Sequence, residues 1–218
     1  KLNFDVETDF VPVAPILDVS NVLTINPDVI NVKTLKEFVD TVKANPGKFN
    51  FASTGNGAGT HMAFAEFNAR LGLDMLHVPY KGGGPALADL LAGHVNSSFL
   101  SPIEVNAHTK SGKLIALGAS SLKRTPALAA LPTFAEAGVT DFEALAWFGF
   151  VTRQGTPPDV LNKMSELLQR ALKSPDVRDK IAQSGDVPAG SMQEFAELLG
   201  REHVRWERTV KAANIKPE

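Results

Sequence analysis

The amino-acid sequence predicts an α/β fold with a parallel or mixed sheet. Short apolar segments of strand length alternate with amphipathic segments of about 8 to 15 residues, the pattern of βαβ units. Two glycine-rich loops, at residues 53–60 and 78–85, each follow a strand-like segment and precede a helix-like one. Ligands of such sheets bind beyond the carboxyl ends of the strands, where both loops are expected.

Start and stop signals delimit the helices. Thr34 with Glu37 and Ser101 with Glu104 have the spacing of capping boxes, in which each side chain bonds the backbone of the other residue. Pro85 is expected at the first position of a helix, where its missing N–H is tolerated. These signals predict helices that begin after residues 34, 60, 84, 101 and 133, and three more at 157–173, 175–184 and 192–213.

Apolar runs between the helices predict the strands. They lie at residues 49–52, 75–78, 94–100, 114–119 and 142–151. No strand-like run separates the last three helices, so the organisation changes near residues 146–155. Three consecutive helices are better explained as a cap packed on another lobe than as more of a wound sheet.

Composition excludes several classes of protein. The chain has 218 residues, 44% apolar and 21% charged, as is ordinary for a globular protein with a core. A formal charge of −2 with interspersed signs argues against nucleic-acid binding. No apolar run reaches the roughly 18 residues needed to span a bilayer. The absence of cysteine excludes thiol catalysis, disulfides and cysteine-ligated metals.

The glycine-rich loops predict a site for a small anion. Backbone N–H groups at a helix N-terminus favour negative charge. Consecutive glycines at 82–84 also let a ligand approach the backbone closely. Side chains that can add hydrogen bonds or charge are Ser53, Thr54, Asn56 and Thr60 in the first loop, and Tyr80 and Lys81 in the second.

Neither loop matches a nucleotide motif. A P-loop needs a lysine after its last glycine, and a dinucleotide fingerprint needs G-x-G-x-x-G, whereas the spacing here is Gly55-x-Gly57-x-Gly59. Three plainer interpretations stay open: a turn without ligand, Tyr80 packed in the core, and Lys81 facing solvent.

The ionisable residues show no catalytic pattern. No H-x-x-x-H or H-E-x-x-H spacing occurs among the five histidines, so neither a metal nor a cofactor is expected. No G-x-S-x-G elbow occurs either, although a Ser–His nucleophile pair stays open. Asp89, one turn into the helix after Pro85, could anchor the second loop or face solvent.

Several strings of the sequence resemble the Bug receptors. These are the extracytoplasmic solute-binding proteins of tripartite tricarboxylate transporters. The resemblance covers essentially the whole chain, and the matching strings lie at residues 43–48, 53–57, 77–82, 85–93, 111–114, 131–138, 146–149, 155–157 and 212–216.

The resemblance implies a periplasmic-binding-protein-like fold of type II, in which two α/β lobes hinged by crossing strands close on a ligand. Residues 20–145 would form the second lobe. Residues 1–19 and 146–218 would form the remnant of the first lobe, because family members normally begin well upstream of this start. The first lobe is therefore expected to be incomplete here.

The ligand implied by the resemblance is a small carboxylate: a mono- or dicarboxylate, an amino acid or an aromatic acid. One departure bears on its identity, since this chain has Leu100-Ser101 where the family usually has Asp-Asn. That departure removes a carboxylate at the edge of the cleft. Carried over residue by residue, the ligand contacts would be Ser53, Thr54, Gly55, Asn56, Gly57, Tyr80, Lys81, Gly82 and Gly83.

The expected function is that of a periplasmic receptor without catalytic activity, which captures a carboxylate for the membrane components of a transporter. Two alternatives stay open: the effector-binding domain of a transcriptional regulator, and an enzyme acting on a small anionic substrate. Without the front of the first lobe, the C-terminal helices and the strand at 142–151 are expected to expose apolar surface. That surface would cause self-association or local disorder.

Overall fold

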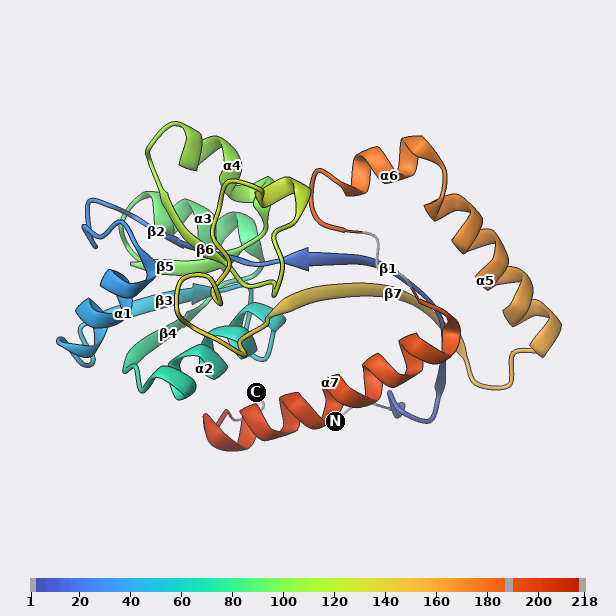
Figure 1. Cartoon of the computed structure of the whole chain (residues 1–218). Helices are drawn as coiled ribbons and strands as arrows, with labels where there is room; N and C mark the ends of the chain where they lie inside the picture. Colours follow the sequence, from blue (N-terminus) through green and yellow to red (C-terminus); the bar gives the residue numbers. More distant parts are fainter. Residues whose placement is uncertain (1–2, 187–189, 216–218) are drawn as a thin grey trace.

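The computed structural model describes residues 3–186 and 190–215, and it contains two β-sheets (Figure 1). The larger sheet has five strands and, with the helices packed around it, makes up one side of the molecule. The smaller sheet is a two-stranded ribbon that runs from this part to the C-terminal helices. This architecture confirms the predicted α/β class.

The larger sheet has mixed strand directions. It is formed by β2 (Val22–Ile25), β3 (Phe49–Ser53), β4 (Met75–Pro79), β5 (Ser97–Leu100) and β6 (Ile115–Ala119), in the order β4-β3-β5-β2-β6. β3 is parallel to β4 and β5, whereas β2 is antiparallel to β5 and β6. The connecting helices are α1 (Leu35–Lys43), α2 (Gly59–Leu71), α3 (Gly83–Leu91) and α4 (Pro102–Lys110).

The carboxyl ends of four strands meet at one edge of the larger sheet. Val22, at the start of β2, pairs with Leu100 at the end of β5 and with Ala119 at the end of β6. β3 runs parallel to β5 and β4 runs parallel to β3, so their carboxyl ends lie at the same edge. The ribbon strand β1 (Phe10–Ser20) reaches β2 through Asn21, and this edge therefore faces the ribbon.

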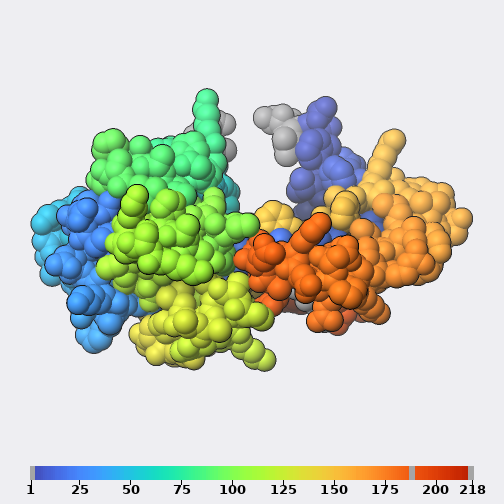
Figure 2. Space-filling model, turned by 90° about the horizontal axis from the view of Figure 1, so that it is seen from above, coloured from blue at the N-terminus to red at the C-terminus, as the bar shows by residue number. Residues whose placement is uncertain are grey.

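The ribbon consists of β1 paired antiparallel with β7 (Leu145–Arg153). Helices α5 (Pro158–Leu172) and α7 (Met192–Ala212) pack against β1, and α6 (Pro175–Ile181) follows α5. In Figure 1, α7 runs along the ribbon and continues beneath α2, which it contacts. Figure 2 shows the molecule from above, with a notch between the five-stranded part and the part that carries the ribbon helices.

Phenylalanine rings fill the core of the five-stranded part. The ring centroid of Phe67 lies 5.5 to 6.0 Å from those of Phe64, Phe99, Phe134 and Phe142. All five side chains are buried. They come from α2, from β5 and from the segment between β6 and β7, so burial of aromatic area joins stretches that are distant in sequence.

The structure differs from the predicted elements in several places. The prediction of a helix after residue 133 was wrong, since residues 134–138 form turns. Phe134 is buried in the core, and Gly138, with φ of 94°, ends the turn. α3 begins at Gly83, which makes Pro85 its third residue and not its first. β1 and β2 were not predicted. The capping boxes at the starts of α1 and α4 are confirmed.

The chain passes between the two sheets twice, and hydrogen bonds join the two passages. The Ser120 hydroxyl accepts from the Asn21 backbone N–H (2.9 Å) and donates to the Ala144 carbonyl oxygen (2.7 Å). The Asn21 amide group donates to the same carbonyl (2.8 Å). Backbone bonds from Ser120 to Asn21 and from Ala144 to Ser120 complete the network. We call these three residues the crossing network.

Replacing Ser120 with alanine tests the crossing network. Ser120→Ala leaves the buried N–H of Asn21 without an acceptor, which should lower the free energy of unfolding by about 1 to 3 kcal/mol. Urea unfolding followed by circular dichroism measures the change. Ser111→Ala removes an exposed hydroxyl and should change stability by no more than about 0.5 kcal/mol. Equal effects of the two changes would contradict the structural role of Ser120.

The ribbon exposes large apolar side chains. Phe148 and Phe150, two residues apart on one face of β7, are 54% and 50% exposed. A groove between β1, β7 and α7 is lined by further apolar side chains, among them Trp147, Trp206 and Val210. The self-association expected from the sequence stays a prediction, and these side chains are where we expect it to occur.

Light scattering coupled to size-exclusion chromatography tests this expectation. The chain should show an average mass above that of a monomer at micromolar concentration, and Phe148→Ser/Phe150→Ser should shift it toward the monomer. The matched control is Leu76→Ser/Ile103→Ser, which removes two exposed apolar side chains from the five-stranded part. A monomeric starting chain would contradict the prediction.

Candidate functional site

The two glycine-rich loops lie side by side. They follow β3 and β4, which are adjacent parallel strands with Ser53 opposite Pro79. The Tyr80 N–H donates to the Ser53 carbonyl oxygen (3.0 Å), and the Gly82 N–H donates to the Thr54 carbonyl oxygen (3.1 Å). All ten residues predicted for the site therefore lie on two hydrogen-bonded loops at the sheet edge that faces the ribbon.

Internal hydrogen bonds hold the first loop closed. Thr60 Oγ1 accepts from the Thr54 N–H and bonds the Thr54 hydroxyl, both at 2.9 Å. Gly57 has φ of 72°, a conformation that favours glycine. Asn56 and Gly57 are exposed at the tip of the loop, and α2 begins directly after it at Gly59. The first-turn N–H groups of α2 consequently point at the mouth of the loop.

Two stacked histidines support the first loop. The rings of His61 and His77 lie 3.6 Å apart and are nearly parallel. His61 Nδ1 accepts from the Gly57 N–H (3.0 Å), and His77 Nε2 lies 2.6 Å from Ser53 Oγ. His77 was not among the residues predicted for the site. The pairing of β4 with β3 brings it beneath the loop, and in the sequence it stands only as the first residue of the family-like string at 77–82.

Both histidines are held neutral. Burial lowers the pKa of His77 to about 4, and repulsion from His61 adds to the shift. Burial also lowers the pKa of His61. A neutral ring is required at His61, because its Nδ1 accepts a hydrogen bond and so carries no proton.

The Ser–His pair left open by the sequence is present, but it is not displayed to a ligand. Ser53 is 0% exposed, and its hydroxyl donates to the Gly55 carbonyl oxygen (3.0 Å) within the loop. A nucleophile must reach a substrate carbonyl or phosphoryl group. Ser53 and His77 therefore act as a loop anchor in this conformation.

The second loop is anchored through Tyr80. Its hydroxyl donates to Asp89 Oδ2 (2.6 Å), so Asp89 anchors the loop, one of the two roles left open for it. Burial and this hydrogen bond raise the pKa of Tyr80 to about 12, which keeps the phenol protonated. The ring is half-buried against the core, and Lys81 is exposed beside it. Gly82, with φ of 112°, precedes α3.

Glu104 places a carboxylate at this sheet edge. Its Oε2 accepts from the Ser101 N–H (2.9 Å) and hydroxyl (2.6 Å), and a side chain at Gly83 would collide with its Oε1. The partial positive charge at the start of α3 is therefore already opposed by an acid. The start of α2 has no acidic residue in its first turn and is the stronger attractor for an added anion.

A small cavity adjoins the crossing network. It has a volume of about 270 Å³ and is lined by Asp18, Glu143 and Asp186 together with Lys123 and Arg124. Burial raises the pKa of Asp18 to about 6, and the carboxylates of Glu143, Asp186 and Glu202 add to the shift. The three carboxylates outnumber the two basic side chains, so this cavity is less favourable for an anion than the start of α2.

Two further observations concern residues 3–186 and 190–215. No group of three His, Cys, Asp or Glu side chains in this part of the chain could hold a metal ion. No helix in it is both long and apolar enough to cross a bilayer.

Comparison with solved structures defines the class of protein. Rpa4515 of R. palustris, solved with adipate, superposes with a TM-score of 0.89 at 28% identity over 100% of this chain and 73% of its own. The periplasmic binding protein BugD superposes with a TM-score of 0.85 at 29% identity, and the match covers 99% of this chain and 73% of BugD. MatC of Rhodopseudomonas palustris, with bound malate, superposes with a TM-score of 0.84 at 29% identity, and the match covers 96% of this chain and 72% of MatC. These similarities confirm the periplasmic-binding-protein-like fold.

The chain belongs to the tripartite tricarboxylate transporter receptor family, whose model matches residues 1–215. A UPF0065 protein from the tcbD-tcbE intergenic region of Pseudomonas sp. strain P51 is 34% identical over 96% of this chain and 63% of its own length. BugT of Bordetella pertussis is 32% identical over 99% of this chain and 66% of its own length. The chain thus spans about two thirds of these relatives. The lobe boundaries at residues 20 and 145 stay a prediction.

The neutral histidines predict a dependence of stability on pH. In the unfolded chain the pKa of His77 rises from about 4 to its ordinary 6.5, so the unfolded state binds more protons between these values. Stability should be full above pH 6.5 and decrease as the pH falls toward 4. Urea unfolding at pH 7 and at pH 4.5 measures the loss in the free energy of unfolding between these two pH values. That loss should be smaller in His77→Gln.

His94→Gln serves as the control for this measurement. His94 is exposed and lies outside the stacked pair, so the variant should keep the acid sensitivity of the starting chain. An undiminished pH effect in His77→Gln would contradict the role assigned to that histidine.

Proposed function

We propose that this chain is part of a periplasmic solute-binding receptor that captures a small carboxylate between its glycine-rich loops and the ribbon. The observation that carries the proposal is the placement of two helix N-terminal loops side by side at the sheet edge facing β1 and β7. The proposed contacts come from the residues predicted from the sequence: Thr54, Gly55, Asn56, Gly57, Thr60, Tyr80, Lys81, Gly82 and Gly83, with the buried Ser53 supporting the first loop from within.

These contacts are not equal in the proposal. The hydroxyls of Ser53 and Tyr80, and the N–H groups of Thr54, Gly57 and Gly82, already make hydrogen bonds within the loops or to the helices that follow them. The first-turn N–H groups of α2 and the ammonium group of Lys81 are better placed to meet a ligand. A carboxylate at the helix start gains about 0.3 to 2 kcal/mol from the dipole, and charge-assisted hydrogen bonds add to this.

The structural neighbours support a carboxylate as the ligand. Rpa4515 and MatC were solved with adipate and malate, both small dicarboxylic acids. We extend this to a mono- or dicarboxylate here, with an amino acid or aromatic acid as further candidates. Family membership supports the periplasm as the compartment and the membrane components of a tripartite transporter as partners. We expect binding without turnover, since Ser53 is buried.

Thermal unfolding against a panel of acids tests the proposal. Adipate or malate at millimolar concentration should raise Tm, while nucleotides should not. At about 100-fold over Kd the stabilisation approaches 2.7 kcal/mol. Lys81→Gln should weaken carboxylate binding about threefold to tenfold, because a charge-assisted contact is lost. Lys110→Gln, at the far end of α4, removes the same charge and should leave the affinity unchanged.

Two outcomes would contradict the proposal. One is a shift of equal size with every anion, including phosphate. The other is the absence of any carboxylate-specific shift both in this chain and in a longer chain extended to the length of the relatives. Conversion of the acid into product would favour the enzyme alternative.

A further inference from the structure

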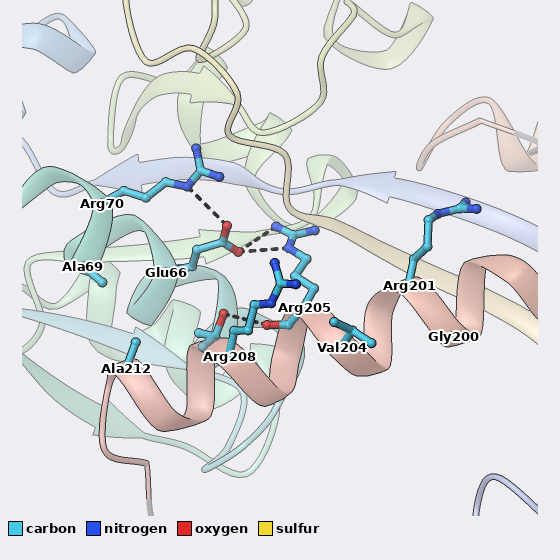
Figure 3. Close-up of a pocket in the computed structure, with 10 residues that line it drawn as sticks. Glu66, Ala69, Arg70, Gly200, Arg201, Val204, Arg205, Arg208 and Ala212 are labelled. Atoms are coloured by element: carbon cyan, nitrogen blue, oxygen red, sulfur yellow. Dashed lines mark hydrogen bonds and ion pairs between the residues drawn. The ribbon is translucent and has the colours of Figure 1, made fainter.

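A groove separate from the glycine-rich loops lies between α2 and α7 (Figure 3). It has a volume of about 740 Å³. On α2 it involves the second half of the helix, whereas the glycine-rich loop adjoins the first turn. Its lining consists of Glu66, Ala69, Arg70, Gly200, Arg201, Val204, Arg205, Arg208, Thr209 and Ala212.

Positive charge dominates this groove. Four arginines line it with a single glutamate, although the whole chain has a formal charge of −2. That glutamate, Glu66, is shared: Arg205 Nη2 lies 2.7 Å and Arg70 Nε 3.3 Å from its carboxylate. Arg201 and Arg208 are exposed, and no carboxylate of the described residues lies within 4 Å of either guanidinium. Among the residues that the structure describes, these two cationic side chains thus have no acidic partner within 4 Å.

The arginines are spread along the groove. Positions 201, 205 and 208 share one face of α7, and Arg201 and Arg208 are separated by about 10 Å along the axis. Figure 3 shows Arg201 apart from Arg205 and Arg208, toward the other end of the helix. The lining residues other than the arginines and Glu66 are small or short, namely Ala69, Gly200, Val204, Thr209 and Ala212. This arrangement suits an elongated molecule with separated negative groups better than one compact ion.

We propose that the α2–α7 groove binds an acidic peptide segment of a partner protein. An extended peptide places alternate side chains roughly 6.5 to 7 Å apart, so aspartate or glutamate residues along one face can reach successive arginines. Arginine forms paired, planar hydrogen bonds with carboxylates. Small residues in the lining leave room for the peptide backbone between the two helices.

The groove also joins the two sheets. α7 packs on β1 of the ribbon, and α2 packs on strands of the larger sheet. Arg205 links them directly, because it contacts Glu66 on α2 and donates to the Glu143 carbonyl oxygen ahead of β7. A segment bound in the groove therefore contacts elements attached to both sheets. This inference does not rest on carboxylate capture by the glycine-rich loops.

Binding of a fluorescein-labelled hexaglutamate peptide to the whole chain, followed by fluorescence anisotropy at low salt, tests the inference. Arg201→Gln/Arg208→Gln should weaken binding about tenfold, because both unpaired charge-assisted contacts are lost. The control Arg178→Gln/Lys180→Gln removes the same charge from exposed positions on α6 and should stay within about twofold. A second variant, Val204→Glu, adds a competing carboxylate to the groove and should also weaken binding.

The inference would be overturned if hexaglutamate did not bind the unaltered chain, or if the two double variants lost equal amounts of affinity. It would also be overturned if inorganic phosphate bound the groove as tightly as the peptide and displaced it. A dimer that Arg201→Gln/Arg208→Gln abolishes would identify a second copy of the chain as the occupant and would also overturn it. Adipate-induced stabilisation should persist in both double variants, so failure here is distinguishable from failure of the proposed carboxylate site.

Discussion

The crossing network is the constraint on which the rest of the structure depends. Asn21 and Ala144 are the two points where the chain passes between the sheets, and Ser120 bonds both. All three residues are buried, and the polar groups that form the network are hydrogen-bonded to one another. Leaving one of these groups unpaired away from water would lower the free energy of unfolding. The network therefore determines where the ribbon begins relative to the larger sheet, and with it the position of α5 and α7.

The candidate site follows from that geometry. The ribbon starts at the edge where β3, β4, β5 and β6 end, so the glycine-rich loops face it. Within the loops, most polar groups are satisfied internally, and two neutral histidines support the first loop from below. The positive end of α2 and Lys81 are the groups that we propose to meet a ligand. Acidic groups beside the crossing network and at Glu104 limit where an anion can lie.

α7 connects the site-bearing part to the ribbon in a second way. Its N-terminal half covers β1, and its C-terminal half contacts α2 through Arg205 and Glu66. A charge pair of this kind, with both side chains partly buried, needs both partners, because removing one leaves the other charge unpaired. The same helix face carries Arg201 and Arg208, whose guanidinium groups have no acidic partner among the described residues. One helix thus serves both packing and the proposed recognition of an acidic segment.

The sequence by itself determined what depends on local interactions. Capping residues such as Thr34 and Ser101 begin α1 and α4 as predicted, and glycine-rich turns predicted both loops of the candidate site. β1 was not predicted, because Pro12 and Pro15 interrupt its apolar run, and its pairing with β7 joins segments more than a hundred residues apart. Tertiary structure alone decided that Phe134 enters the core instead of a helix, that His77 stacks on His61, and that arginines of α7 meet Glu66. Each of these contacts depends on burial between segments distant in sequence, and local propensity carries no record of that.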